Sequence, residues 1–300
     1  MRALVTGATG FIGRRLLRQL TNPVVLSRNP EKAKKILGSV EVYRWIPDQE
    51  SPPKEAFNGV DVVFNLAGEP IVSGRWTESK KKRIFDSRVG GTRNLVSAIE
   101  GLGKRPKTLV SASAIGCYGS RGEEILDEAD SPGDDFLAKL CKAWEGEALR
   151  AAQFGVRVVI PRFGIVLGEE GGALKKMLFP FKLGLGGRVG NGKQWVSWIH
   201  ADDVVGIMMH AVSREDIKGP INAVTAAPVR NEEFTKVLAQ TLHRPASLPV
   251  PAFLLKIVMG EMSTVLLSSQ RVIPRVADRA GYKFLYPKLE LALEAILGKK

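Results

Sequence analysis

A glycine-rich turn directly after the first apolar run constrains the fold of this chain more than any other feature. The turn joins an apolar run at residues 2–6 to an amphipathic pattern at 11–20. Gly7 is expected to allow a tight turn, Gly10 a close approach of a pyrophosphate, and Gly13 close packing of helix on strand. Free N–H groups at the start of that helix favour phosphate. The pattern therefore predicts a dinucleotide site, whose expected contacts are Gly7, Thr9, Gly10, Phe11, Ile12 and Gly13.

Apolar runs alternate with helical patterns through the first half of the chain. Candidate strands lie at residues 2–6, 24–26, 40–45, 61–66, 108–112 and 156–161. Candidate helices lie at residues 11–20, 79–99 and 135–153. This alternation is typical of an α/β fold, and it predicts a doubly wound parallel sheet of the Rossmann type with helices on both faces.

The second half has a different pattern. Residues 164–198 are rich in glycine, which indicates loops around a ligand, and helical patterns follow at 231–242, 252–267 and 288–297. We predict a Rossmann domain over residues 1–165. Residues 166–300 would form the substrate pocket and a smaller, mostly helical C-terminal lobe, although residues near 195–225 could return to the sheet.

Net charge and the length of the apolar runs limit which partners and which cellular compartment are expected. The net charge of +13 is spread along the chain, and its densest cluster, residues 80–83, is expected to be a solvated helix face rather than a nucleic-acid site. No apolar run reaches the roughly 18 residues of a membrane span, and the first residues show no secretory pattern. We therefore expect a cytoplasmic protein without a membrane partner.

The metal-ligating residue types are few. Cys117 and Cys141 do not have the spacing of metal ligands, and the chain has three histidines. The sequence therefore predicts no metal site. In a reducing compartment both cysteines would remain thiols.

The end of the second strand indicates which dinucleotide is bound. An acidic residue there would hold the ribose 2′-hydroxyl of NAD, but the sequence has Ser27 and Arg28. A guanidinium is suited to a 2′-phosphate, and the serine can add a hydrogen bond. NADP, in its reduced form NADPH, is therefore the predicted cofactor.

Other strand ends complete the expected cofactor trough. The ends of parallel strands meet at one edge of a sheet, which is where ligands bind in such folds. Leu66, Ala67 and Gly68 follow the fourth strand, and Arg162 ends the sixth strand and could face the cofactor.

These motifs together resemble those of the extended short-chain dehydrogenase/reductases, and of their atypical, epimerase-like subfamily in particular. The resemblance rests on TGATGFIG at residues 6–13, NLAG at 65–68, SASAIGCYG at 111–119, PRFGIVLG at 161–168 and WIHADD at 198–203. It covers essentially the whole chain. The resemblance implies NADP binding and an oxidoreductase or epimerase activity on an undefined substrate.

The sequence departs from the larger family at its catalytic pair. That family uses a serine with Tyr-x-x-x-Lys, but alignment on Glu145 puts Leu137 in place of the tyrosine and Cys141 in place of the lysine. Ser113 remains as the predicted catalytic residue. Tyr118 could supply a phenol and Cys141 a thiol, although local packing is the favoured explanation of both residues.

The substrate pocket has four candidate residues, which are Glu69, Arg188, Trp198 and His200. Histidine can transfer protons near neutral pH, although a structural role is the favoured explanation of His200. Asp202 or Asp203 is expected to cap the helix that follows His200.

Two functions remain open at this point. The first is an NADP-dependent oxidoreductase, or a nucleotide-sugar-type epimerase that works by transient hydride removal, without Tyr-x-x-x-Lys. The second is an NADP(H)-binding regulatory or redox-sensing protein with little or no catalysis. The expected partner is a small-molecule substrate, and the expected state is a monomer or a homodimer.

Overall fold

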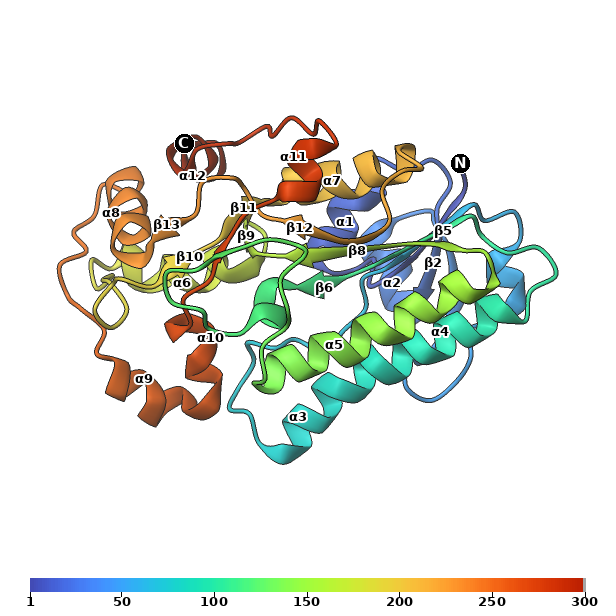
Figure 1. Ribbon diagram of the computed structural model, residues 1–300, viewed down its shortest axis with the longest axis horizontal. Coiled ribbons are helices and arrows are strands. Elements are labelled where there is room, and N and C mark those ends of the chain that lie inside the picture. Colours follow the sequence, from blue (N-terminus) through green and yellow to red (C-terminus); the bar gives the residue numbers. More distant parts are fainter. Residues whose placement is uncertain (299–300) are drawn as a thin grey trace.

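A parallel β-sheet forms the centre of the molecule (Figure 1). The computed structural model describes residues 1–298. The strands of this sheet are β1 Ala3–Thr6, β2 Val24–Ser27, β3 Glu41–Arg44, β4 Val62–Asn65, β5 Thr108–Ser111, β6 Ser113–Ala114, β8 Arg157–Phe163 and β12 Gly219–Ala223. They pair in parallel in the order β12-β8-β5-β4-β1-β2-β3, and β6 also pairs with β8. The strand order reverses between β1 and β4, which is where a doubly wound sheet opens a crevice for a ligand.

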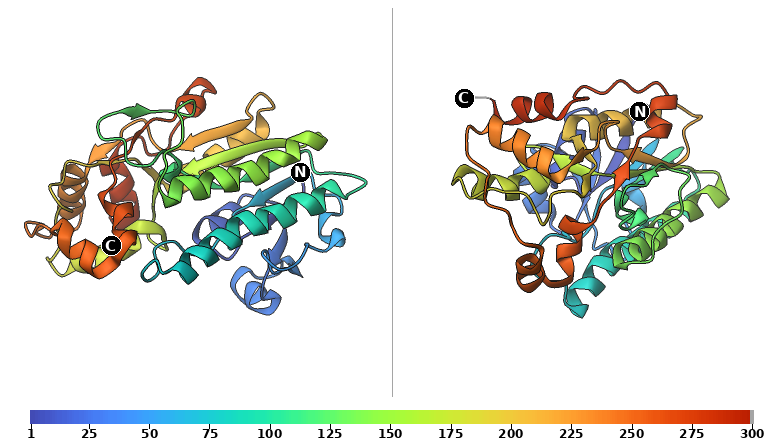
Figure 2. Two further views of the ribbon diagram at one scale, coloured as in Figure 1. Left: turned by 60° about the horizontal axis from the view of Figure 1, so that its bottom comes forward. Right: turned by 60° about the vertical axis from the view of Figure 1, so that its left-hand side comes forward.

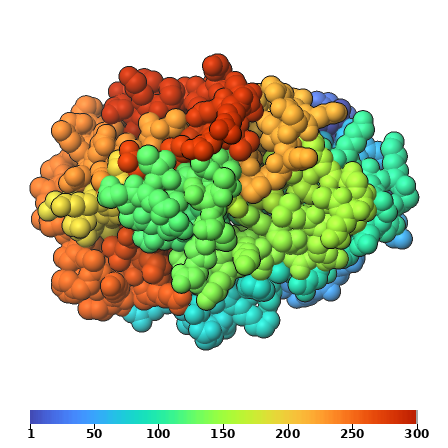
Figure 3. Space-filling model, in the orientation of Figure 1, coloured from blue at the N-terminus to red at the C-terminus, as the bar shows by residue number. Residues whose placement is uncertain are grey.

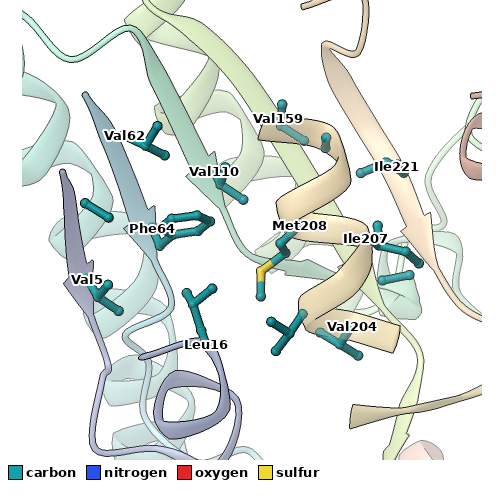
Figure 4. Close-up of a cluster of buried hydrophobic side chains, with 14 of the residues drawn as sticks. Val5, Leu16, Val62, Phe64, Val110, Val159, Val204, Ile207, Met208 and Ile221 are labelled. Carbon is teal, nitrogen blue, oxygen red and sulfur yellow. The ribbon is translucent and has the colours of Figure 1, made fainter. Parts of the chain in front are cut away.

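Helices cover both faces of this sheet, as the alternating pattern predicted. Helices α1 (Phe11–Leu17) and α7 (Ala201–Ser213) lie on one face. Their Leu16 and Met208 point toward Phe64 of β4 in a shared apolar cluster (Figure 4). Helices α4 (Gly91–Glu100) and α5 (Phe136–Leu149) lie side by side on the other face (Figure 2). The doubly wound parallel sheet is therefore confirmed.

The edge strand β12 comes from the second half of the chain. Its residues pair with β8, and α7 before it packs against α1. Residues in the predicted range 195–225 thus contribute a strand to the sheet. A domain division near residue 165 stays a prediction.

The remaining elements lie around this core or in the helical C-terminal region. The helices are α2 Pro30–Leu37, α3 Glu78–Phe85, α6 Gly172–Lys182, α8 Asn231–Thr241, α9 Ala252–Met259, α10 Thr264–Leu267, α11 Arg275–Arg279 and α12 Leu289–Leu297. A π-helical turn spans Asp86–Gly90, and 3₁₀ turns span Lys54–Phe57, Ile115–Tyr118, Arg150–Phe154 and Gly260–Ser263. The short strands are β7 Ile125–Leu126, β9 Ile165–Leu167, β10 Trp195–Val196, β11 Trp198–His200, β13 Val229–Arg230 and β14 Arg271–Val272.

Three predicted helices have different bounds in the structure. The helix expected over 11–20 ends at Leu17. The helix expected over 252–267 is broken, because Gly260 has a positive φ of +61° and ends α9. The helix expected over 79–99 consists of α3, the π turn and α4 in succession. The π turn contains one residue more than a turn of α-helix.

Segments that are far apart in the sequence lie side by side in three small two-stranded sheets. Strand β7 pairs with β14, which places the segment near residue 125 beside the C-terminal segment, as the green and red surfaces of Figure 3 show. Strand β9 pairs with β11, and β10 pairs with β13.

Some negative findings hold for residues 1–298. No helix there is long and apolar enough to cross a membrane. The same residues contain no group of three or more His, Cys, Asp or Glu side chains placed to hold a metal ion. The basic cluster at 80–83 is not wholly solvated, because Lys80 is buried and its Nζ donates to Glu69 Oε1 at 2.6 Å.

Candidate functional site

A groove follows the carboxyl ends of β1, β2 and β4, where the strand order reverses. Its volume is about 350 Å³, and its lining comprises residues 7–10, 25–28, 45, 47, 48, 66–70 and 87. The groove thus includes the glycine turn, the end of the second strand and the segment after β4. We refer to it below as the groove.

The glycine turn forms the floor of the groove with no room for side chains. Gly7 has a φ of +68°, and a Cβ there would lie 2.6 Å from the Leu66 carbonyl oxygen. A Cβ on Gly13 would lie 2.4 Å from the Gly7 carbonyl oxygen, so the helix packs directly on the turn. Gly10 is the N-cap of α1 and provides no side-chain cap. The first N–H groups of α1 therefore remain available to a phosphate, and this cradle fits a dinucleotide.

Buried hydrogen bonds fix the two turns that face each other across this floor. The Thr6 hydroxyl donates to Asn65 Oδ1 at 2.9 Å. The Thr6 Oγ1 also accepts hydrogen bonds from the N–H groups of Leu66 and Ala67, each at 3.0 Å. Asn65 in turn donates to Thr92 and Ser111. The turns after β1 and β4 are therefore held at a constant separation.

The predicted contacts of the cofactor divide into two groups. Thr9, Ser27 and Arg28 line the groove, and the guanidinium of Arg28 is exposed at its edge. Phe11 and Ile12 do not line it. The Phe11 ring lies against Gly171 and Gly172, and the Ile12 side chain packs into the core. For these two residues the main-chain N–H groups alone are placed to reach a phosphate.

A second cavity continues from the groove past Leu66, Ala67 and Gly68, which line both spaces. Its volume is about 390 Å³, and it lies between the sheet and the segments near residues 115, 137, 177 and 265. Most of its wall is apolar, with large side chains from Leu137, Phe163, Met177, Phe234 and Leu266. We refer to it below as the cavity. Of the predicted catalytic residues, Ser113 and Cys141 line it.

Ser113 is held by a buried ion pair. Its hydroxyl donates to Glu145 Oε1 at 2.6 Å. Arg162 donates to the same carboxylate through Nε at 2.9 Å and Nη2 at 2.8 Å. Because the single hydroxyl proton of Ser113 is directed to Glu145, its lone pairs can accept a hydrogen bond from a ligand.

Arg162 does not line the groove, contrary to the cofactor contact expected for it. It is buried, and its Nη1 donates to the Tyr118 hydroxyl at 2.9 Å, so its donors are directed to Glu145 and Tyr118. Its position in β8, opposite Ser113 of β6, directs the side chain across the sheet to α5.

Tyr118 does not reach the cavity. It is fully buried, and its hydroxyl donates to Asn222 Oδ1 at 2.8 Å. Burial raises the pKa of its phenol above the usual value. The expected role of Tyr118 as a proton donor to the substrate does not fit this position, because a packed polar network surrounds the hydroxyl.

Cys141 lines the cavity but is poorly suited to proton transfer. Its Sγ lies 3.8 Å from the Ala114 carbonyl oxygen, and burial raises the pKa of the thiol to about 11. Burial also raises the pKa of the Cys117 thiol. Neither cysteine has the depressed pKa of a reactive thiolate.

The four residues expected in the substrate pocket lie outside the cavity lining. Trp198 is fully buried, and its indole donates to the Ala227 carbonyl at 3.0 Å. Glu69 lines the groove instead, where its hydrogen bond from Lys80 lowers the pKa of the carboxyl. Arg188 lies in a separate surface hollow, 4.0 Å from Glu232.

His200 has a structural position. Its Nδ1 accepts the N–H of Asp202 at 3.1 Å, so the histidine caps α7 in place of the expected aspartates. Its ring stacks on Tyr286, with 4.0 Å between the centroids. Asp203 instead accepts hydrogen bonds from Tyr282 and from the main chain at Leu285 and Tyr286.

Sequence reasoning missed several residues of the two spaces. Trp45, Pro47 and Asp48 line the groove because they follow the carboxyl end of β3, and that position was a usable signal. Glu145 was not predicted as a site residue, although a carboxylate at a buried helix position opposite Arg162 indicates an ion pair.

The glycine cradle, the parallel strand order and the adjoining cavity define a Rossmann-type dinucleotide-binding protein. The family model described as the NAD dependent epimerase/dehydratase family matches residues 3–223. A second model, a domain of unknown function called DUF1731, matches residues 250–296. The chain belongs to the NAD dependent epimerase/dehydratase family.

Relatives match over nearly their whole length. The chain is 38% identical over 305 residues to the epimerase family protein YfhF of Bacillus subtilis, covering 100% of this chain and 99% of that protein. It is 42% identical over 303 residues to the chloroplastic SDR39U1 homolog of Arabidopsis thaliana, covering 99% of this chain and 87% of that protein. The crystal structure of human epimerase family protein SDR39U1 (isoform 2) with NADPH matches with a TM-score of 0.89 at 34% identity, covering 100% of both chains. These matches confirm the predicted resemblance to the epimerase-like subfamily.

Proposed function

We propose that this protein is an NADP-dependent oxidoreductase that acts on a carbon bearing a hydroxyl or carbonyl group in the cavity. The observation that carries the proposal is the continuity of the groove with the cavity at Leu66, Ala67 and Gly68, with Ser113 on the cavity wall. The same first step, removal of a hydride from such a carbon, would serve an epimerase. The bound cofactor would supply the hydride chemistry.

Three features support NADP as the cofactor. Arg28 stands at the edge of the groove at the end of β2, where a 2′-phosphate would need a cation. Strand β2, Val24–Ser27, does not end in a carboxylate residue. The human relative of known structure was crystallised with NADPH.

Ser113 and Glu145 provide a path for the proton. The Ser113 Oγ would accept the hydroxyl proton of the substrate while its own proton moves 2.6 Å to Glu145 Oε1. In the reducing direction both protons move back. Arg162 fixes the carboxylate with two hydrogen bonds and so keeps Oε1 directed at Ser113. This arrangement would replace the tyrosine and lysine that the sequence lacks.

Ser113→Ala tests the proposal. Hydride exchange is followed as NADPH absorbance with a fixed panel of aliphatic and aromatic aldehydes, ketones and alcohols. Loss of a positioned proton-transfer group should lower kcat by roughly 10²–10⁴-fold, while the Kd for NADPH changes little because the glycine turn and Arg28, which would bind its phosphates, lie in the groove and apart from Ser113. Ser213→Ala, exposed on α7, is the matched control. Full turnover in Ser113→Ala would contradict the assignment.

An NADP(H)-binding regulator with little catalysis is the second candidate. It is favoured by one observation, that none of the described residues lining the cavity is a tyrosine. This function predicts tight NADPH binding and no hydride exchange with any compound of the panel. Redox sensing through Cys117 or Cys141 is disfavoured, since both thiols are buried and have raised pKa values.

A further inference from the structure

Arg88 is a buried arginine that the proposed chemistry does not use. It lies in the π-helical turn between α3 and α4, which Figure 1 shows as one continuous helix, and its side chain lines the cavity. Turns of this kind within α-helices are frequent at functional sites. Its guanidinium lies against Gly68, where a Cβ would be 3.1 Å from Nη2. Arg88 therefore stands where the groove and the cavity join.

The hydrogen-bonding capacity of Arg88 is only partly used. Nη1 donates to the carbonyl oxygens of Glu69 at 2.9 Å and Ile84 at 3.3 Å. Nε is buried without any partner, and Nη2 has no acceptor among residues 1–298. One face of the guanidinium lies 5.3 Å from the ring centroid of Trp144. Two nitrogens of a nearly buried cation, Nε and Nη2, therefore have no acceptor among residues 1–298.

The charge of Arg88 also lacks a direct ion pair, and Glu69 acts on it only from a longer distance. Among residues 1–298 no carboxylate lies within 4.0 Å of it, although the other arginine beside the cavity, Arg162, is paired through two nitrogens with Glu145. Burial lowers the pKa of Arg88 to about 10, so it still carries its charge at neutral pH. A buried charge without a partner is strongly destabilising, and an anionic ligand in the cavity would supply the opposite charge.

The rest of the cavity wall offers no second cation. The other charged residue of the lining is Asp135, whose Oδ1 accepts the N–H of Ala138 and caps α5. Several polar groups of the wall are already engaged, because Ser197 donates to the Gln270 carbonyl and Thr264 to the Glu261 carbonyl. A ligand with two phosphates would bring more negative charge than this wall can balance. One carboxylate on an apolar body matches it.

We propose that Arg88 binds the carboxylate of an otherwise apolar substrate, an organic monocarboxylate whose hydrocarbon body fills the cavity. This inference rests on the proposed function for the statement that the ligand is a substrate. A guanidinium binds a carboxylate through charge-assisted hydrogen bonds, and Nη2, which has no acceptor among residues 1–298, would donate them. The largely apolar wall of the cavity suits the hydrocarbon body of such a ligand.

The test measures binding and needs no turnover. The full-length protein, saturated with NADP⁺, is titrated by calorimetry with octanoate and with octanamide, which has the same body and no charge. We expect octanoate to bind at least about tenfold more tightly, the scale of one charge-assisted interaction. Arg88→Met, which keeps an apolar chain in the space, should remove this preference by weakening octanoate alone. Arg88→Lys should retain part of it.

Each other outcome overturns the proposal. Equal affinities of the wild-type protein for octanoate and octanamide would contradict it without any variant, and so would a failure of both to bind. If Arg88→Met weakens NADPH and leaves octanoate unchanged, the guanidinium serves a cofactor phosphate. Octanamide binding and the melting temperature show whether the variant is folded. Loss of hydride exchange in other tests would leave these affinities unaffected, so the two proposals fail separately.

Discussion

The Ser113 hydroxyl and the Glu145 carboxylate are 2.6 Å apart, and this contact limits what the cavity can do to a ligand. Because the serine proton is directed to Glu145, Ser113 is suited to accept a hydrogen bond from a substrate hydroxyl, as the oxidising direction of the proposed reaction requires. Arg28 is exposed at the edge of the groove, whereas Arg88 is buried where the groove and the cavity join. At this scale the chemistry depends on a few polar atoms in a largely apolar surrounding.

Arg28→Ala should weaken NADPH far more than NADH. Loss of charge-assisted hydrogen bonds to a 2′-phosphate costs about 1.5–3 kcal/mol, or roughly 10–100-fold in Kd. NADH lacks that phosphate, so its Kd should change little. Both constants are measured by quenching of tryptophan fluorescence, with Lys35→Ala, exposed on α2, as the control. Equal losses for the two nucleotides would remove the argument for the 2′-phosphate.

Single elements were predicted well where a local pattern and the packing agree. The turn at Gly7–Gly13 and the strands β1, β2, β4 and β5 were predicted close to their observed bounds, because a sheet buried on both faces needs continuous apolar runs. Helix α2 was missed, although Asn29 caps it and Pro30 is its first residue, which are recognisable start signals. The cap of α7 was assigned to an aspartate because a histidine rarely serves there.

Gly13→Ala should disturb α1 at its contact with the turn. The added Cβ would meet the Gly7 carbonyl oxygen at 2.4 Å, so helix and turn must separate. We expect a loss of about 1–3 kcal/mol in the free energy of unfolding, together with weaker NADPH binding. Gly146→Ala is the matched control, since a Cβ there meets nothing within 4 Å and should stabilise α5 by up to about 1 kcal/mol. Urea denaturation of both variants checks the contrast, and equal effects would contradict it.

His200 should make the stability of the protein depend on pH. Burial lowers the pKa of His200, and nearby Arg15 acts in the same direction while Asp202 and Asp203 oppose it. As the pH falls, His200 is therefore protonated at a higher pH in the unfolded chain than in the folded protein. The full contribution of the neutral cap is present above the unfolded value of about 6.5 and is lost as the pH falls through the folded pKa.

His200→Asn separates this titration from the cap itself. Asparagine is a good N-cap and does not titrate. We expect the free energy of unfolding of the variant to fall less than that of the wild type between pH 7 and pH 5. The comparison uses urea denaturation at each pH, and parallel curves for the two proteins would show that His200 does not cause the pH dependence.

At the scale of the whole molecule, the path of the chain decides what lies in the cavity. The doubly wound parallel sheet could be inferred from alternating patterns, but the cavity wall could not, because it combines segments near residues 66, 115, 137, 177 and 265. Trp198 and His200 follow a glycine-rich stretch and looked like pocket residues, yet their side chains pack into the core and onto Tyr286. Long-range packing of this kind leaves no periodic signal in the sequence.

The charge of the whole molecule belongs to the same scale. The net charge of +13 raised the possibility of a nucleic-acid partner. Many basic side chains are engaged within the protein, such as Arg93 with Glu147 and Arg230 with Glu123. We propose that the excess charge favours anionic ligands such as NADPH rather than a duplex.

A crystal structure of the protein with NADPH tests the central claim most directly. We expect the pyrophosphate against the first turn of α1, the 2′-phosphate beside Arg28, and the nicotinamide past Gly68 with its reactive carbon facing Ser113. A nicotinamide directed away from the cavity, or a 2′-phosphate remote from Arg28, would contradict the account.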